Sequence, residues 1–135
     1  MNHGAASILL VEDERIIALE MKHQLQRLGY RVAASLSAGE QVLEQAAALS
    51  PDLVLMDIML AGKLDGIETV RQMRRACPAP VIFCTAFTDA DTMQRAQDVL
   101  PVAILTKPVD MEALRRALHD GLNSGATCPR APTPG

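Results

Sequence analysis

The segment Ser7-Ile-Leu-Leu-Val-Glu-Asp13 is an apolar run that ends in two carboxylates. Such an uninterrupted run is typical of a strand buried on both faces of a parallel sheet. The segment Leu53-Val-Leu-Met-Asp57 repeats the pattern and again ends in a carboxylate. Two later runs end in a hydroxyl and an ammonium group: Val81-Ile-Phe-Cys-Thr85 and Ala103-Ile-Leu-Thr-Lys107. The sequence therefore predicts buried strands whose carboxyl ends carry polar side chains.

Helical periods separate these runs. A short strand at 31–34 completes a set of five strand–helix units. Apolar positions at helical spacing predict helices from Ile17 to Leu28, closed by Gly29, and from Ile67 to Cys77. Further helices are expected at 38–49, with Ser37 as N-cap, and from Met111, with Asp110 as N-cap. The segment 89–99 is expected to be a polar, weakly amphipathic helix. Right-handed crossovers place such helices on both faces of a parallel sheet, so the fold class is α/β.

The 135-residue chain is 49% hydrophobic and 21% charged, which is the composition of one globular domain. We expect an N-terminal extension at 1–6, the domain at 7–121 and a disordered tail at 122–135, where small and polar residues dominate without an apolar period.

Composition and charge argue against two classes of partner. The chain has no Trp, one Tyr and two Phe, too few aromatic rings for a base-stacking platform. Its formal net charge of −3 gives no basic field for a phosphate backbone, so nucleic acid is not an expected partner. The longest apolar runs fall well short of the roughly 20 residues of a membrane-spanning helix. Since the N-terminus also lacks the features of a signal peptide, no membrane partner and a cytoplasmic location are expected.

The strand ends suggest one kind of chemistry. Ligands of parallel α/β sheets bind beyond the carboxyl ends of the strands, where Glu12, Asp13 and Asp57 should converge. Carboxylates that are ionised together call for a compensating cation, and Mg²⁺ prefers such oxygen ligands. Thr85 and Lys107 could contact the oxygens of a phosphoryl group. Each residue alone is more often a turn, strand-end or surface residue; it is the combination that predicts an aspartyl phosphate on Asp57.

The motifs resemble the receiver domain of two-component response regulators over about 7–121. The segments that carry the resemblance are Ile8-Leu-Leu-Val-Glu-Asp-Glu14, Leu53-Val-Leu-Met-Asp-Ile58, Asp65-Gly-Ile-Glu68, Val81-Ile-Phe-Cys-Thr-Ala86 and Leu105-Thr-Lys-Pro108. The resemblance implies a flavodoxin-like, doubly wound (βα)₅ fold with strand order 2-1-3-4-5. It also implies a cis Lys107–Pro108 peptide.

The resemblance also implies a role for each site residue. Asp57 would accept a phosphoryl group from a histidine of a sensor kinase or of a histidine phosphotransfer protein. Mg²⁺ would be bound by four groups: the carboxylates of Glu12, Asp13 and Asp57 and the backbone carbonyl of Met59. Thr85 and Lys107 would contact the phosphoryl group. The protein would then be no enzyme beyond its own phosphorylation and dephosphorylation.

Several positions depart from the family pattern. Ile104 stands where the family usually has the Tyr or Phe that turns inward on phosphorylation. The loop through Ala61 and Gly62-Lys-Leu64 lacks a common proline and is one residue longer than the usual form. We also expect no output domain after Gly121. We expect the switch to work through the 85–92 loop, where Phe87 is the nearby aromatic, and through the helix after it.

Three readings of function remain open. The first is a stand-alone receiver that signals by docking to a downstream protein, forms a homodimer or relays its phosphoryl group. The second is a Mg²⁺-dependent phosphohydrolase, although Met59 stands where haloacid dehalogenases need a second Asp. The third is a degenerate receiver that acts only as a binding module.

Overall fold

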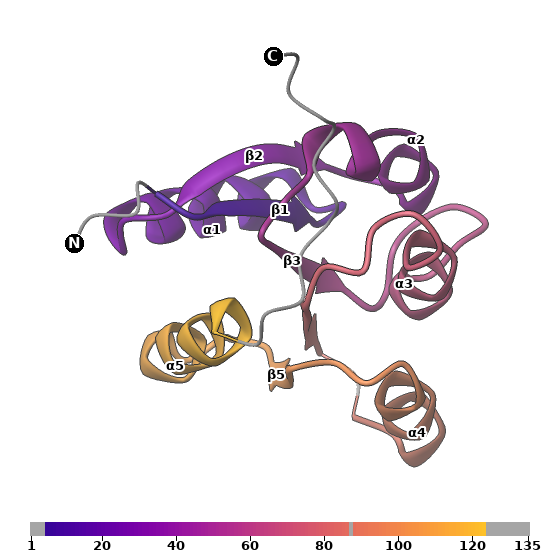
Figure 1. Ribbon diagram of the computed structural model, residues 1–135. Coiled ribbons are helices and arrows are strands. Elements are labelled where there is room, and N and C mark those ends of the chain that lie inside the picture. Colours follow the sequence, from indigo (N-terminus) through magenta and orange to yellow (C-terminus); the bar gives the residue numbers. More distant parts are fainter. Residues whose placement is uncertain (1–4, 87, 124–135) are drawn as a thin grey trace.

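The computed structural model describes residues 5–86 and 88–123. Strands and helices alternate through this part of the chain (Figure 1). The strands are β1 (Ser7–Val11), β2 (Arg31–Leu36), β3 (Leu53–Asp57), β4 (Val81–Thr85) and β5 (Ala103–Thr106). The helices are α1 (Arg15–Arg27), α2 (Gly39–Leu49), α3 (Gly66–Met73), α4 (Ala90–Asp98) and α5 (Met111–Leu122).

The strands form one parallel sheet in the order β2-β1-β3-β4-β5. This confirms the predicted α/β, flavodoxin-like fold with strand order 2-1-3-4-5. Every residue of β1, β3 and β4 is buried, as the uninterrupted apolar runs predicted. The residues of β5 are only partly buried or exposed, because this strand lies at the edge of the sheet.

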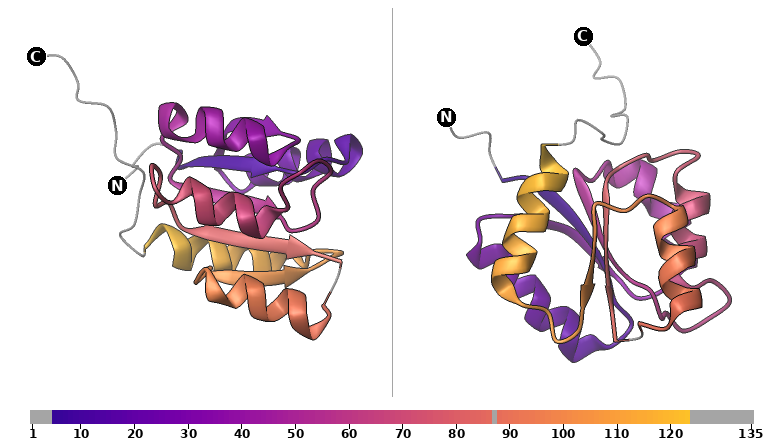
Figure 2. Two further views of the ribbon diagram at one scale, coloured as in Figure 1. Left: turned by 90° about the vertical axis from the view of Figure 1, so that its right-hand side faces the viewer. Right: turned by 90° about the horizontal axis from the view of Figure 1, so that it is seen from below.

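Helices cover both faces of the sheet. Helices α1 and α5 lie on one face, and α2, α3 and α4 lie on the other (Figure 2). Alternate strand residues point to opposite faces, so Leu9 and Val54 pack under α2–α4, whereas Ile8 and Leu55 pack under α1 and α5. The sheet therefore separates two apolar layers.

Most predicted helix ends agree with the structure. Asp110 caps α5 by accepting a hydrogen bond from the Ala113 N–H, and Gly29 follows α1 with φ at +95°. The predicted N-cap Ser37 is wrong, because Ala38 occupies that position. The Gln41 side chain instead reaches back and accepts from the backbone N–H groups of Ser37 and Ala38.

Two further predicted boundaries differ from those in the structure. Strand β2 continues to Leu36, two residues past the predicted end at 34, because it pairs with β1 as far as Val11 opposite Leu36. Leu122, placed in the tail by sequence, is the last residue of α5 and packs against the layer under α1 and α5. The rest of the predicted tail, from residue 124, lies outside the described residues, as does most of the N-terminal extension.

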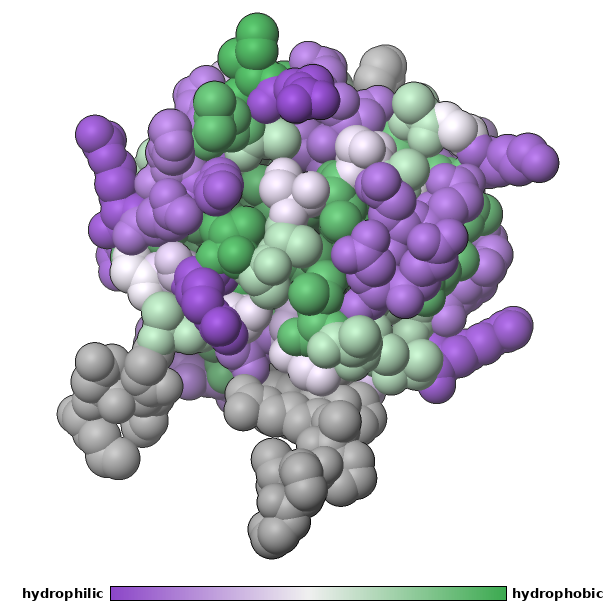
Figure 3. Space-filling view, turned by 90° about the horizontal axis from the view of Figure 1, so that it is seen from above, coloured by the Kyte–Doolittle hydropathy of each residue, from purple (hydrophilic) through white to green (hydrophobic). Residues whose placement is uncertain are grey.

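Apolar side chains remain on the surface. Figure 3 shows one face, where apolar patches lie between hydrophilic side chains. Among the described residues, the large apolar side chains most open to solvent are Ile16, Leu19, Met59 and Leu100. None of the described helices is long and apolar enough to cross a lipid bilayer.

Candidate functional site

The order of the strands brings the polar strand ends together. Strands β1 and β3 are neighbours in the centre of the sheet, with Val11 opposite Met56. The residues that follow Val11 therefore lie beside Asp57, the last residue of β3. This is also where the chain order of the strands reverses, the usual ligand site of an open parallel sheet.

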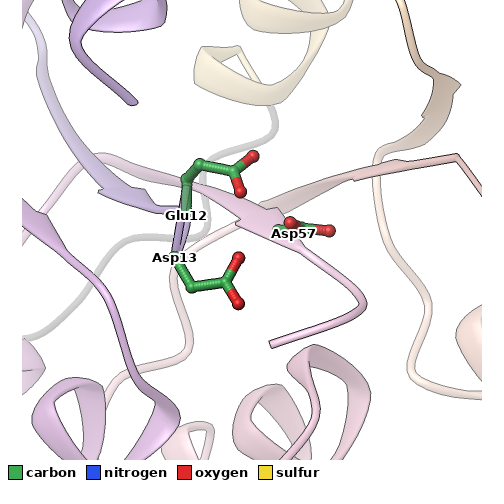
Figure 4. A group of neighbouring side chains, drawn as sticks. All are labelled: Glu12, Asp13 and Asp57. Atoms are coloured by element: carbon green, nitrogen blue, oxygen red, sulfur yellow. The ribbon is translucent and has the colours of Figure 1, made fainter. Parts of the chain in front are cut away.

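Three carboxylates meet at this edge. Glu12, Asp13 and Asp57 each offer an oxygen, and these oxygens lie within 4.8 Å of one another. The side chains of Glu12 and Asp13 extend from the end of β1 toward Asp57 (Figure 4). Glu12 and Asp57 are each only 6% exposed, so their charges are poorly screened by water.

Lys107 comes from the end of β5 and reaches two of these carboxylates. Its Nζ lies 2.7 Å from Oε1 of Glu12 and 3.0 Å from Oδ2 of Asp57. The peptide that follows, Lys107–Pro108, is cis, as the resemblance implied. One ammonium thus neutralises part of a cluster that carries three carboxylates.

The backbone supplies further hydrogen bonds to the carboxylates. The Met59 N–H donates to Oδ1 of Asp57 at 3.1 Å, and the Ala61 N–H donates to Oδ2 of Asp13 at 3.0 Å. Both donors belong to the 58–65 loop between β3 and α3. Two hydrogen bonds therefore hold the loop against the acidic cluster.

Burial shifts the pKa values of two site residues. Burial and the neighbouring Asp57 carboxylate raise the pKa of Glu12, although Lys107 opposes the change. Burial lowers the pKa of Lys107, but its hydrogen bonds to Glu12 and Asp57 outweigh this, and the net pKa is raised. Lys107 therefore stays charged, while burial disfavours the charged form of Glu12.

This electrostatic imbalance fits a cation. The three carboxylates are oxygen donors of the type that Mg²⁺ prefers, and among the described residues one ammonium compensates them. The groups that would hold the ion are the carboxylates of Glu12, Asp13 and Asp57.

Thr85 and Cys84 lie on the neighbouring strand β4. Thr85 is fully buried at the end of the strand, and its carbonyl accepts a hydrogen bond from the Lys107 N–H at 2.8 Å. Cys84 is paired with Asp57 in the sheet register. Burial raises the pKa of the Cys84 thiol to about 12, so this side chain is an uncharged wall of the site, not a nucleophile.

A close backbone approach fixes the start of α3 at the site. The Gly66 N–H donates to the Ile58 carbonyl at 2.7 Å. A Cβ at position 66 would lie only 2.1 Å from the backbone oxygen of Asp57. The glycine of the Asp65-Gly66 motif is thus required for space, a role that the sequence motif alone does not reveal.

A pocket of about 400 Å³ adjoins the acidic cluster. One wall is α1, with Ile17, Met21 and Gln24, and the opposite wall includes Pro108 and Val109. Glu12, Asp57 and Lys107 also line the pocket. The cluster can therefore be reached from the α1 side of the molecule.

The structure describes one of the two residues predicted for the switch. Phe87 lies outside the described residues. Ile104 lies opposite Phe83 in the β4–β5 register and is partly buried against the layer under α2–α4. Its side chain is thus on the same face of the sheet as α4.

Sequence reasoning missed two arginine contacts. Arg74 of the segment after α3 donates to the carbonyls of Val99 and Leu100. Arg95 of α4 forms an ion pair with Asp65 at 2.8 Å. No sequence spacing signals these contacts, because the partners are far apart along the chain.

Comparisons with known proteins agree with this fold. The family described as "Response regulator receiver domain" matches residues 8–119. The signal receiver domain of a modulated diguanylate cyclase from Desulfovibrio desulfuricans G20 is similar in structure, with a TM-score of 0.83 and 40% identity over 87% of this chain and 94% of that chain. The BeF₃-activated N-terminal receiver domain of Klebsiella pneumoniae RstA has a TM-score of 0.79 and 25% identity over 87% of this chain and 99% of that one.

Curated relatives include longer proteins. The transcriptional regulatory protein PdtaR of Mycobacterium tuberculosis is 32% identical over 112 residues. The match covers 83% of this chain and 54% of that protein, so this chain spans about half the length of that relative.

Proposed function

The chain belongs to the response regulator receiver domain family, and we propose that Asp57 accepts a phosphoryl group from a phosphohistidine. The observation that carries this proposal is the cluster at the sheet edge. Asp57 is a buried carboxylate with one oxygen bonded to Lys107 and the other to the Met59 N–H. It is held in one orientation, as a nucleophile for in-line attack must be.

In the transfer, an Asp57 oxygen attacks phosphorus, the P–N bond of the phosphohistidine breaks, and the imidazole nitrogen leaves with the electron pair. Lys107 would stay close to the phosphoryl oxygens, since it already binds Asp57. Thr85, at the end of the next strand, would supply a hydroxyl to the same group. These contacts stabilise charge on the transferring group.

Mg²⁺, bound by Glu12, Asp13, Asp57 and the Met59 carbonyl, would neutralise the negative charge of the phosphoryl oxygens. Glu12 and Asp13 supply two adjacent carboxylates at the end of β1 for this purpose. Lys107 alone leaves the cluster net negative, which supports a requirement for a divalent cation.

The donor would be a sensor histidine kinase or a histidine phosphotransfer protein. Receiver domains take their phosphoryl group from such proteins as a family, and the pocket between α1 and Pro108 gives access to Asp57. The phosphorylated form would act through contact with a downstream protein, through a homodimer or by transfer to a further histidine.

A phosphohydrolase is a weaker alternative. Residue 59, two positions past Asp57, is a methionine, which has no acid–base chemistry to turn over an aspartyl phosphate. A degenerate receiver is also weaker, because no acidic or basic site residue has been lost.

Transfer of labelled phosphoryl groups from an autophosphorylated histidine kinase tests the proposal. We expect the wild-type protein with Mg²⁺ to take up the label, and Asp57→Asn or added EDTA to prevent it. Equal uptake by Asp57→Asn would contradict the role of Asp57. Many turnovers on small phosphoesters would favour the hydrolase instead.

A further inference from the structure

Helix α4 is weakly held by the apolar core. Among its described residues, Ala96 is the buried one, whereas α3 buries Ile67, Val70 and Met73. Val99, directly after α4, adds a second buried side chain. Burial of apolar surface is the main stabilising term in folding, so α4 depends more than α3 on its polar contacts.

Two arginines tie α4 to α3 at different points. Arg74, at the C-terminal end of α3, binds the carbonyls of Val99 and Leu100. These carbonyls lie at the negative end of α4, where a cation is favourable. The Arg74 side chain is half-buried, so it forms a firm anchor for the C-terminal end of the helix.

The second tie joins α4 to the site loop. Arg95 Nη2 lies 2.8 Å from Oδ2 of Asp65, and the two side chains are 47% and 28% exposed. The other oxygen of Asp65 accepts the Glu68 N–H at 2.8 Å and so caps α3. An exposed ion pair of this kind is weak, which suits a contact that must be released.

Asp65 ends a loop that depends on the state of Asp57. The Met59 N–H of this loop donates to Asp57 Oδ1, and the Ala61 N–H donates to Asp13. Phosphorylation turns one Asp57 oxygen into the bridging oxygen of an acyl phosphate and leaves the other as a less negative carbonyl. The hydrogen bond from the Met59 N–H to Asp57 is then weakened or moves to a phosphoryl oxygen, and this change acts on the loop that leads to Asp65.

We propose that the Arg95–Asp65 ion pair is a latch that holds α4 in the resting state, and that phosphorylation of Asp57 opens it through the 58–65 loop. The C-terminal end of α4 stays anchored by Arg74, while its N-terminal part becomes free to move. This inference rests on the proposed phosphorylation of Asp57 and names the route by which the signal reaches a surface helix.

The test uses beryllofluoride with Mg²⁺ as a phosphoryl mimic and measures amide chemical shifts and hydrogen exchange. In the wild type, we expect the mimic to shift the amides of Met59 and Thr85 and to speed exchange in α4 by about two- to fivefold, the factor set by one exposed ion pair. In Arg95→Gln, the amide hydrogens of α4 should exchange faster than in the wild type even before the mimic is added. The mimic should then shift the site amides without a further change in α4.

Two variants serve as controls. Asp65→Asn keeps an oxygen that can cap α3 but removes the charge, so α4 should behave as in Arg95→Gln while α3 exchange is unchanged. Arg71→Gln breaks the Arg71–Glu68 pair, which is 2.9 Å long and similarly exposed, and should leave α4 as in the wild type.

The outcomes separate the two proposals. If the site amides respond but α4 of Arg95→Gln exchanges and responds as in the wild type, the latch is wrong and the phosphorylation proposal stands. If the wild-type site amides ignore the mimic, the phosphorylation proposal fails, and the opening step fails with it.

Discussion

Lys107 balances charges that would otherwise repel each other. Its ammonium binds both Glu12 and Asp57, two buried carboxylates at the ends of neighbouring strands. Lys107 holds Asp57, the proposed nucleophile, in place, but its single positive charge does not balance the three carboxylates. At this scale, stability and the proposed chemistry depend on the same side chain.

Removal of Lys107 should therefore destabilise the metal-free protein. In Lys107→Met, Glu12 and Asp57 lose their cationic partner. We expect the free energy of unfolding to fall by about 2 kcal/mol, a value below that of fully buried pairs because the Lys107 side chain is itself partly exposed. Urea denaturation with EDTA measures the loss.

Mg²⁺ should recover part of that stability, because it supplies positive charge to the same carboxylates. The gain on adding Mg²⁺ should be larger in Lys107→Met than in the wild type. Arg116→Met, at an exposed position of α5, is the matched control and should show the wild-type response. An equal gain in all three proteins would contradict the competition between Lys107 and Mg²⁺, and no gain in any of them would contradict a cation site at this cluster.

The sequence predicted the acidic cluster but not every contact within it. Glu12, Asp13, Asp57 and Lys107 were found because they lie at the ends of apolar runs, and parallel strands bring such ends together. The spatial need for Gly66 and the contacts of Arg74 and Arg95 were not found, since they depend on the distance between elements. Ser37 was predicted as a cap because its hydroxyl suits the position, but the longer Gln41 side chain supplies the acceptor.

At the scale of elements, the approach of α3 to β3 sets the position of Asp57. Gly66, at the first turn of α3, lies directly against the backbone of Asp57 and Ile58. A methyl group there meets backbone atoms, which cannot rotate away. The helix or the strand end must therefore move.

Gly66→Ala should lower the free energy of unfolding by roughly 1–3 kcal/mol, as overpacking usually does, and should reduce phosphoryl uptake by Asp57. Gly62→Ala is the contrasting variant: residue 62 has a positive φ, but its Cβ would be 3.6 Å from the nearest atom, a Glu40 carboxylate oxygen. It should cost stability through backbone strain while leaving β3 in place. Normal phosphoryl uptake by a folded Gly66→Ala protein would contradict this account.

The N-terminal cap of α4 should make this helix sensitive to acid. Asp89 accepts hydrogen bonds from the backbone N–H and the hydroxyl of Thr92, and the backbone bond is the main cause of its lowered pKa. A lowered pKa means that the cap stabilises the fold above the ordinary value of 3.8 and is lost as the pH falls through the folded-state pKa.

Hydrogen exchange of α4 should therefore accelerate in this acidic range in the wild type. Asp89→Asn keeps an acceptor oxygen that does not titrate, so the extra acceleration should disappear in this variant. The amides of α5 in the same protein provide the internal reference. The same pH profile for α4 in both proteins would show that the Asp89 cap does not control this helix.

At the scale of the whole molecule, the sheet separates two apolar layers that share no side chains. Ile67 lies in the layer under α2–α4, and Ile82 lies in the layer under α1 and α5. Both are fully buried. Substitutions in separate layers should therefore act independently on stability.

Ile67→Val and Ile82→Val should each lower the free energy of unfolding by about 1 kcal/mol, and the double variant should lose the sum within roughly 0.5 kcal/mol. Ile58 shares the layer of Ile67 and provides the comparison pair, for which coupling is expected. Urea denaturation of the single and double variants gives the values. A large coupling between Ile67 and Ile82 would mean that the layers are not independent.

The central claim is that Asp57 carries the phosphoryl group, and chemical trapping tests it most directly. Borohydride reduces an aspartyl phosphate to homoserine, so the residue that was phosphorylated is read by peptide mass spectrometry. After incubation with a phosphorylated histidine kinase and Mg²⁺, we predict homoserine at position 57 and no conversion of Asp13 or Glu12. Homoserine at another position, or no conversion at Asp57 when the label has been taken up, would contradict the account.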